Sequence, residues 1–352
     1  MINIGFVGCG RIAIFHASIL TQNAVDGARL AACCDIKFEK AKRLGEAVGV
    51  PHYSDVHEMM AKEKLDVIAI LTESGNHAQQ VIELSRYGKP IVVEKPMALQ
   101  IEDADRMIQA CQDNGAKLFV VKQNRFNLPV IKLRQALDNG RFGKLIMATS
   151  RVRWCRQQKY YDDGGWRGTW AMDGGVMTNQ AIHHLDLLEW MMGPVESIFA
   201  KGIHGLAKIE TEDTAGAILK FKNGALGMIE ATTTVRPQDL EASLTIIGEK
   251  GVVELAGISV NEVKTWQFQN PEDDDLEVIQ KYSTFPPNVY GFGHQRYYLD
   301  VVNAVKNDLA PLVDGYEGRK SVVLMNALYE SMETGREVYL NESFTHSRLG
   351  KS

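Results

Sequence analysis

The start of the chain constrains the fold most, because a short apolar run there leads directly into Gly8-Cys9-Gly10-Arg11-Ile12-Ala13. This G-x-G-x-x-A pattern lies between a predicted strand at residues 2–8 and a predicted helix at residues 14–20. In such a turn the first glycine permits the tight bend, the second lets the backbone approach a pyrophosphate, and the alanine allows close helix–strand packing. The free N–H groups at the helix N-terminus attract phosphate. The pattern therefore predicts a dinucleotide site at this turn.

An acidic residue follows at the expected distance. A second predicted strand, at residues 29–34, ends in Asp35, about 25 residues after Gly10 and close to the ~20-residue offset of the acid that binds the adenosine ribose. A carboxylate there repels a 2′-phosphate, so we predict NAD rather than NADP. The alternative, an aspartate that only starts the next helix, is compatible with this role.

Strands and helices then alternate through the first third of the chain. Predicted helices at residues 38–48, 78–87 and 101–114 alternate with predicted strands at residues 66–71, 91–93 and 117–121. This alternation is typical of βαβ units and a parallel sheet. We therefore predict an α/β fold that begins with an N-terminal Rossmann domain at residues 1–123.

Polar residues follow the predicted strands at the edge of the sheet where ligands bind in α/β proteins. Glu94-Lys95-Pro96 comes directly after the strand at residues 91–93, and the proline biases Lys95 towards an extended backbone. A partly desolvated lysine beside a cofactor can act as an acid/base, although an ordinary solvated loop lysine is the alternative. Thr72, Ser74 and Asn76 follow another strand and either contact the cofactor or cap the next helix.

The pattern changes after about residue 125. Long β-like runs at residues 144–154, 195–202, 214–221, 225–235 and 240–247 are joined by hairpin-like turns, and helices are predicted at residues 129–139, 295–306 and 319–332. We predict a C-terminal α+β domain at residues 124–352 with a large open, mostly antiparallel sheet.

A second polar stretch lies in this domain, where apolar spacing predicts one continuous helix at residues 176–192. On such a helix Asn179, His183 and Asp186 share one face, and His183 becomes a candidate acid/base held by Asp186 or placed beside Asn179. A packed core histidine is the alternative. His183, His184 and Asp186 also resemble metal ligands, but adjacent histidines point about 100° apart on a helix, so we expect no metal.

The bulk composition excludes several classes of function. A net charge of −5 gives no electrostatic footprint for nucleic acid, and no apolar run approaches the ~20 residues of a membrane span. The five cysteines include no C-x-x-C pair, which argues against a disulfide framework and suits a reducing compartment. With no signal-peptide pattern at the N-terminus, we expect a soluble cytoplasmic protein.

The motifs together resemble the Gfo/Idh/MocA oxidoreductase family. They are the Gly8-Cys9-Gly10-Arg11-Ile12 turn, Glu94-Lys95-Pro96, and the stretch from Asn179 to His183. The resemblance implies a Rossmann domain, an open-sheet domain and NAD(P)-dependent oxidation of sugar or cyclitol hydroxyls. It implies that Lys95 is the catalytic lysine and that Asn179 and His183 match a D-x-x-x-H motif in which asparagine replaces the usual aspartate.

Further motifs resemble one branch of this family, the WlbA-type UDP-N-acetyl-2-amino-2-deoxyglucuronate (UDP-GlcNAcA) 3-dehydrogenases, in which asparagine at the position of Asn179 looks normal. These motifs are residues 121–125, 165–170, 179–181, 193–197 and 290–294. The resemblance implies NAD-dependent oxidation of the sugar 3-hydroxyl to a 3-keto sugar in lipopolysaccharide biosynthesis, a homo-oligomer (dimer or tetramer), and a downstream aminotransferase.

Two alternatives remain open. One is a family member that acts on another nucleotide sugar, a free sugar or an inositol. The other is a non-catalytic NAD-binding regulator, against which the presence of both Lys95 and His183 argues.

The expected site residues fall into three groups. The catalytic pair is Lys95 and His183. The expected cofactor contacts are Gly8, Gly10, Arg11, Ile12, Asp35, Thr72, Ser74, Asn76, His77, Glu94, Lys95, Gln123, Trp166 and Arg167. The expected substrate contacts, among which arginines would meet the carboxylate and diphosphate, are Lys95, Asn124, Arg125, Arg153, Arg156, Tyr160, Tyr161, Asn179, His183 and Tyr290.

Overall fold

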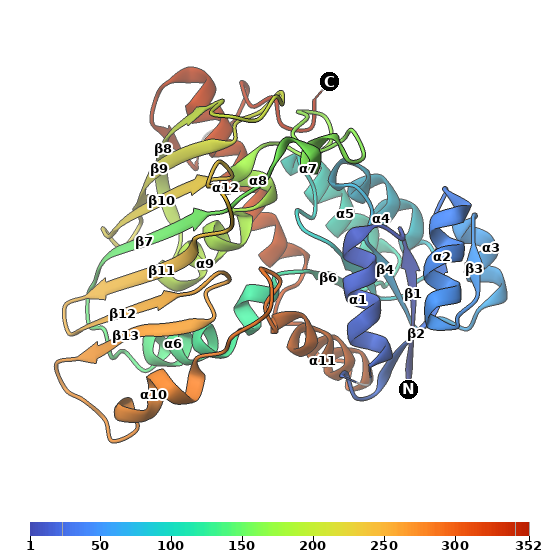
Figure 1. Cartoon of the computed structure of the whole chain (residues 1–352), viewed down its shortest axis with the longest axis horizontal. Helices are drawn as coiled ribbons and strands as arrows, with labels where there is room; N and C mark the ends of the chain where they lie inside the picture. The colour runs from blue at the N-terminus through green and yellow to red at the C-terminus, as the bar shows by residue number, and fades with distance from the viewer. Residues whose placement is uncertain (23, 342, 352) are drawn as a thin grey trace. The chain divides into compact units, whose positions relative to one another are not determined.

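The computed structural model describes residues 1–22, 24–341 and 343–351 (Figure 1). The chain forms two compact units. The first consists of Met1–Lys122 and His294–Val322, and the second of Gln123–Gly293 and Val323–Ser352. The long helix α12, Gly315–Thr334, therefore contributes to both units.

The first unit is built on a six-stranded sheet in the order β3-β2-β1-β4-β5-β6, in which every paired strand runs parallel to its neighbour. This order is that of a Rossmann fold, and it confirms the predicted parallel sheet. The strands β4 and β5 are buried along their whole length, as expected of a parallel sheet with both faces covered. The strands are β1 Ile2–Val7, β2 Ala28–Cys34, β3 His52–Tyr53, β4 Val67–Ile70, β5 Ile91–Val93 and β6 Leu118–Val120.

The helices of this unit bury one apolar face each. In α5, for example, Ala104, Met107, Ile108 and Cys111 recur at helical spacing and are buried. The short helix α3 is capped by Asp55, whose side chain accepts a hydrogen bond from the N–H of Glu58, and the sequence patterns did not predict it. The helices are α1 Arg11–Thr21, α2 Phe38–Val48, α3 Val56–Lys62, α4 His77–Ser85, α5 Ile101–Asp113 and α11 Gly293–Lys306.

The second unit is built on an eight-stranded sheet in the order β13-β12-β11-β7-β10-β9-β8-β14. Neighbours are antiparallel except β7 and β10, which are parallel, so the predicted mostly antiparallel sheet is confirmed. The strands are β7 Leu145–Arg153, β8 Val195–Ile203, β9 Thr214–Phe221, β10 Leu226–Thr232, β11 Glu241–Gly248, β12 Gly251–Ala256, β13 Glu262–Phe268 and β14 Val338–Tyr339.

One face of this sheet is covered by helices, and the other is open. Along β9, Ala215, Ala217, Leu219 and Phe221 alternate with exposed residues and are buried. Helix α9 packs against β7 and β10 on the covered side, as Figure 1 shows. The other helices of this unit are α6 Leu128–Asp138, α7 Gln158–Asp162, α8 Val176–Asn179, α9 Ile182–Met192 and α10 Asp275–Tyr282.

The predicted helix at residues 176–192 is wrong in one respect, because it is interrupted at Gln180–Ala181 between α8 and α9. The carbonyl of Val176 accepts hydrogen bonds from both the Gln180 and the Ala181 N–H, which widens the turn there. The N–H of His184 then bonds to the carbonyl of Ala181, three residues back. The helical frame therefore changes between Asn179 and His183, and simple i, i+4 spacing does not describe them.

Among the helices in residues 1–22, 24–341 and 343–351, none is both long and apolar enough to cross a membrane.

Candidate functional site

The glycine turn of the first unit has the geometry that a dinucleotide requires. Gly8 adopts φ +94°, and a Cβ there would lie 2.9 Å from the backbone of Leu71, so a larger residue would not fit. Gly10 has open space where its Cβ would be, and it begins α1 without a side-chain cap. The first N–H groups of α1, including those of Arg11 and Ile12, are thus available to a phosphate.

Asp35 is fixed at the end of β2 by two backbone donors. Its Oδ2 accepts a hydrogen bond of 2.9 Å from the N–H of Cys9, inside the glycine turn, and its Oδ1 accepts one of 2.8 Å from the N–H of Lys37. Each carboxylate oxygen keeps a lone pair for a further donor. The arrangement suits an acceptor of ribose hydroxyls beside a phosphate-binding turn.

His77 joins the segments that follow β4 and β5. Its Nδ1 lies 2.8 Å from the carbonyl oxygen of Pro96, and its Nε2 lies 3.1 Å from that of Thr72. Burial lowers the pKa of His77. Thr72 also donates to Gln80 over 2.6 Å, and Ser74 is buried in the same segment. His77 therefore has a structural role, because it connects two segments at the sheet edge where we expect the cofactor.

Glu94, one residue before Lys95, is the centre of a buried network. The residue is only 4% exposed, and its Oε1 lies 3.0 Å from Nε2 of His16, whose Nδ1 lies 2.7 Å from the hydroxyl of Tyr298. Burial raises the pKa of Glu94, but the hydrogen bond with His16 and the charges of His16, His294 and Lys95 together lower that pKa to about 2. The carboxylate is thus ionised and accepts from His16.

The carboxylate of Glu94 also fixes the backbone of Lys95, the candidate catalytic residue. Oε2 of Glu94 accepts a hydrogen bond of 2.9 Å from the N–H of Lys95, and the N–H of Glu94 bonds to the carbonyl of Ile70 in the adjacent strand. Lys95 is itself half-buried. His16, Glu94 and His294 bring three ligand-type atoms within 4.8 Å of one another. Because both ring nitrogens of His16 are in hydrogen-bond distance of a partner, we interpret this group as a hydrogen-bond network.

In the second unit, His183 and Gln123 meet. The amide nitrogen of Gln123 lies 3.0 Å from Nε2 of His183, so the ring nitrogen accepts the hydrogen bond. Asp186, the alternative partner considered for His183, pairs instead with Arg125. His184 is buried next to Trp154, and burial lowers its pKa to about 4, which identifies it as a neutral core residue.

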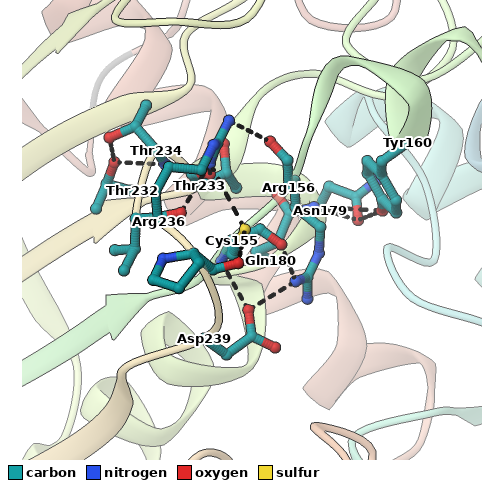
Figure 2. A network of polar contacts seen from close by, with 12 residues as sticks. Cys155, Arg156, Tyr160, Asn179, Gln180, Thr232, Thr233, Thr234, Arg236 and Asp239 are labelled. Atoms are coloured by element: carbon teal, nitrogen blue, oxygen red, sulfur yellow. Dashed lines mark hydrogen bonds and ion pairs between the residues drawn. The ribbon is translucent and has the colours of Figure 1, made fainter.

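Asn179 lies in a polar cluster with Tyr160 and Gln180. The hydroxyl of Tyr160 donates to Oδ1 of Asn179 over 3.3 Å, and Nε2 of Gln180 donates to the same Oδ1 over 3.2 Å and to the Tyr160 hydroxyl over 3.3 Å (Figure 2). Burial raises the pKa of Tyr160, so the phenol keeps its proton. Tyr290 is near enough to contribute to this shift.

Two arginines stack on Tyr160. The guanidinium carbon of Arg167 lies 4.7 Å from the centroid of the Tyr160 ring and 4.8 Å from that of Trp166, and that of Arg156 lies 5.6 Å from the Tyr160 ring. Arg156 also pairs with Asp239 at 2.9 Å, a contact visible in Figure 2. These cations lie beside the Asn179 cluster and can attract an anion.

The remaining predicted substrate residues have other hydrogen-bond or ion-pair partners in the unit, although the ring centroid of Tyr161 also lies 5.1 Å from that of Tyr160. Arg125 is 2% exposed and gives two hydrogen bonds of 2.8 Å to Asp186. Arg153 pairs with Glu230 and with Glu241 on the open side of the sheet. Asn124 is buried in the turn Gln123–Phe126, and Tyr161 is buried with its hydroxyl 2.8 Å from that of Thr233.

The known proteins that this chain resembles agree with this geometry. A family model described as "Oxidoreductase family, NAD-binding Rossmann fold" matches residues 2–122, and one described as "Oxidoreductase family, C-terminal alpha/beta domain" matches residues 134–340. The chain belongs to the Gfo/Idh/MocA oxidoreductase family. Its first unit therefore contains an NAD-binding Rossmann domain, and the glycine turn with Gly8 and Asp35 fits that cofactor.

Two solved structures of this family are similar over nearly the whole chain. The WlbA dehydrogenase from Bordetella pertussis, crystallised with NADH and UDP-GlcNAcA, is 42% identical with a TM-score of 0.92 over 97% of this chain and 98% of that one. The WlbA dehydrogenase from Chromobacterium violaceum, in complex with the same two ligands, is 41% identical with a TM-score of 0.89 over 96% of this chain and 95% of that one.

A curated relative has a different substrate. The myo-inositol 2-dehydrogenase of Thermotoga maritima is 28% identical over 347 residues, which cover 96% of this chain and 98% of that protein. Membership of the Gfo/Idh/MocA family therefore establishes an NAD-binding oxidoreductase and leaves the substrate to further argument.

Several residues of these networks were not predicted from the sequence. His16 and Tyr298 are 282 positions apart, so no local pattern connects them. Gln180 lies within a recognised motif but was given no role in the site. Asp173 lies outside the motifs, and its position next to Gly174-Gly175 was the only available signal for it.

Proposed function

We propose that this protein catalyses the NAD-dependent oxidation of the 3-hydroxyl of UDP-GlcNAcA to the 3-keto sugar. The observation that carries the proposal is the similarity, at 42% identity and over 97% of the chain, to a WlbA dehydrogenase crystallised with NADH and UDP-GlcNAcA. The polar cluster around Tyr160 and the two stacked arginines support it, because this substrate carries hydroxyls and several negative charges.

The cofactor supplies the hydride acceptor when it is bound. The residues of the chain orient the substrate and move one proton. Lys95 takes the proton of the sugar hydroxyl, and His183 assists it. The ionised Glu94 fixes the backbone N–H of Lys95, and Gln123 orients the ring of His183 by donating to its Nε2. General acid/base help of this kind contributes ~10²–10⁴-fold to a rate.

We expect the anionic groups of the substrate to be bound by arginines that lie beside the cluster of Tyr160 and Asn179. Arg125 is neutralised by Asp186 in the interior, and Arg153 lies between two glutamates, Glu230 and Glu241. Arg156, which pairs with the half-buried Asp239, and Arg167 both stack on Tyr160 beside Asn179. Both arginines are half-buried, and their place beside this cluster makes them the better candidates for the substrate carboxylate and diphosphate.

The competing substrate class is an inositol or another free sugar, which the 28% identical myo-inositol 2-dehydrogenase favours. Initial rates of NADH formation with UDP-GlcNAcA, UDP-GlcNAc and myo-inositol separate the candidates. The proposal requires kcat/KM to be highest for UDP-GlcNAcA and far lower for UDP-GlcNAc, which lacks the carboxylate. Preferred turnover of myo-inositol would reject it, and tight NAD binding without turnover of any of the three would favour a non-catalytic regulator.

We also propose that the chain forms a homo-oligomer through the open face of its second sheet. Phe199, Ile218 and Met228 stand opposite one another on β8, β9 and β10, and they are 39%, 49% and 44% exposed. A continuous apolar row of this kind marks an interaction surface. Light scattering of the wild type and of Ile218→Lys tests this: the wild type should be a dimer or tetramer, and the variant should dissociate. A monomeric wild type rejects the proposal.

The product of such a reaction, a 3-keto nucleotide sugar, is a substrate for transamination. A downstream aminotransferase of lipopolysaccharide biosynthesis is therefore the proposed partner in the pathway.

A further inference from the structure

A buried carboxylate outside the recognised motifs holds the side chain of Asn179. Asp173 is 1% exposed. Its Oδ1 accepts a hydrogen bond of 2.6 Å from Nδ2 of Asn179, and its Oδ2 accepts one of 2.9 Å from the N–H of Gly168. Because both oxygens are engaged, the carboxylate has one orientation, and it ties α8 to the loop that carries Trp166 and Arg167.

This contact determines which way the Asn179 amide points. An ionised carboxylate only accepts hydrogen bonds, so the NH₂ group of Asn179 must face Asp173. Its carbonyl oxygen is thereby turned towards the Tyr160 hydroxyl, at 3.3 Å, and towards Nε2 of Gln180, at 3.2 Å (Figure 2). Reversal of the amide would set the NH₂ group of Asn179 against the NH₂ group of Gln180.

We propose that Asp173 is a positioning residue for the reaction, which acts by fixing the amide of Asn179 and, through it, the hydroxyl of Tyr160 in the orientation that receives the substrate. The inference rests on the proposed function, in which Asn179 and Tyr160 contact the sugar. The inference gives a role in the reaction to a residue that lies outside the sequence motifs and that acts without touching the substrate.

The geometry permits an exchange of the two side chains. In the double variant Asp173→Asn/Asn179→Asp, the new amide at position 173 donates its NH₂ to the new carboxylate and accepts the N–H of Gly168 with its oxygen. The carboxylate at position 179 then accepts from Tyr160 and Gln180. Every hydrogen bond of the original cluster keeps a donor and an acceptor.

Each single variant breaks this pattern in a different way. In Asp173→Asn, the new side-chain NH₂ group must face one of two donors, either the backbone N–H of Gly168 or the side-chain NH₂ group of Asn179. Asn179→Asp brings two carboxyl groups to about the 2.6 Å of the present contact, where like charges do not both ionise and the pair shares one proton. The titratable and charged groups that surround this cluster include Glu212, Tyr160, Tyr290, Arg156 and Arg167.

The test compares kcat, KM, NAD affinity and the pH–rate profile for these three variants, with the substrate of the panel that the wild type oxidises best. Both single variants should lose about 10²-fold in kcat/KM, the scale of a small misplacement at a reacting centre. Asn179→Asp should keep the NAD affinity of the wild type, because Asn179 is not among the expected cofactor contacts. Asn179→Asp should gain a limb in its pH–rate profile that falls as the shared proton leaves, and the double variant should recover to within about tenfold of the wild type without that limb.

The exposed Asp162, in the helix α7 of the same region, provides the control, because Asp162→Asn removes a charge outside the cluster and should leave all four quantities unchanged. A double variant as impaired as the two single variants combined overturns the positioning role, and so does an unimpaired Asp173→Asn. If Asp173→Asn does not fold, the comparison of Asn179→Asp with the double variant still decides the question. A wild type that oxidises myo-inositol but not UDP-GlcNAcA rejects the proposed substrate alone, and one that oxidises nothing rejects both.

Discussion

Arg125 and Asp186 form a two-pronged ion pair in the interior of the second unit, with both hydrogen bonds at 2.8 Å and with the side chains 2% and 3% exposed. The guanidinium carbon also lies 4.9 Å from the centroid of the Trp190 ring. This pair connects the turn Gln123–Phe126 to helix α9. It therefore holds together the two segments that carry Gln123 and His183.

The first prediction concerns this pair. Asp186→Asn leaves the Arg125 charge buried without its counter-ion, which should lower the free energy of unfolding by about 3–5 kcal/mol. Urea denaturation followed by circular dichroism measures the loss. The control is Glu333→Gln, which breaks the exposed pair of Glu333 with Arg348 and should cost no more than about 1 kcal/mol. Equal midpoints for the two variants would contradict the prediction.

The second prediction concerns the pH dependence of stability. Glu212 is buried, and burial raises its pKa to about 7, although the N–H of Met177 and the hydroxyl of Tyr329 donate to its Oε1. The unfolded chain loses this proton near pH ~4.3. Between these two values the folded state binds the extra proton, so stability falls as pH rises through this window and then levels off above about pH 7.

Glu212→Gln removes the titration and keeps an oxygen that can accept both hydrogen bonds. It should flatten this part of the stability profile and raise the free energy of unfolding at pH 8 by on the order of 3 kcal/mol relative to the wild type. Urea midpoints measured from pH 5 to pH 8 provide the comparison. A variant with the wild-type slope would show that Glu212 does not carry the effect.

The third prediction concerns Lys95. Lys95→Met should lower kcat by ~10²–10⁴-fold, because the variant cannot accept the hydroxyl proton, and should leave the dissociation constant for NADH unchanged. Stopped-flow rates and fluorescence titration with NADH measure the two quantities. Lys89→Met, at the opposite end of the same strand, is the matched control and should behave as the wild type. Near-normal kcat in Lys95→Met would remove Lys95 from the mechanism.

The fourth prediction concerns Asp35. Asp35→Asn removes the negative charge beside the glycine turn, so the preference for NAD over NADP, measured as the ratio of kcat/KM values, should fall about tenfold, or ~1.4 kcal/mol. Asp26→Asn, which removes an exposed charge before the other end of β2, should leave the ratio unchanged. An unaltered ratio in Asp35→Asn would mean that the carboxylate does not exclude the 2′-phosphate.

Local patterns were sufficient for the elements that depend on local physics. The predicted helix at residues 38–48 matches α2, and the strand–glycine–helix start matches β1 and α1, because apolar spacing and glycine placement act within a few residues. The short α3 and the strands β12 and β13 were missed. The sequences of β12 and β13 alternate only weakly between apolar and polar residues, and the positions of these two strands depend on pairing with β11 and with each other.

The site was predictable where a residue type follows a strand directly, as Lys95 follows β5 and Asp35 follows β2. It was not predictable where the chain returns from far away. Tyr298 reaches His16 from helix α11, which belongs to the first unit although it follows most of the second in sequence. The interruption at Gln180–Ala181 likewise occurs where the Gln180 side chain donates to Tyr160 and Asn179, and apolar spacing does not reveal such contacts.

The most direct test of the central claim is the identity of the product formed from UDP-GlcNAcA and NAD. We expect one NADH for each sugar oxidised and a product two hydrogen atoms lighter than the substrate. Borodeuteride reduction should then introduce deuterium at C3 of the sugar, as read by mass spectrometry and NMR. Label at another carbon, or no oxidation of UDP-GlcNAcA by a protein that binds NAD, would contradict the account.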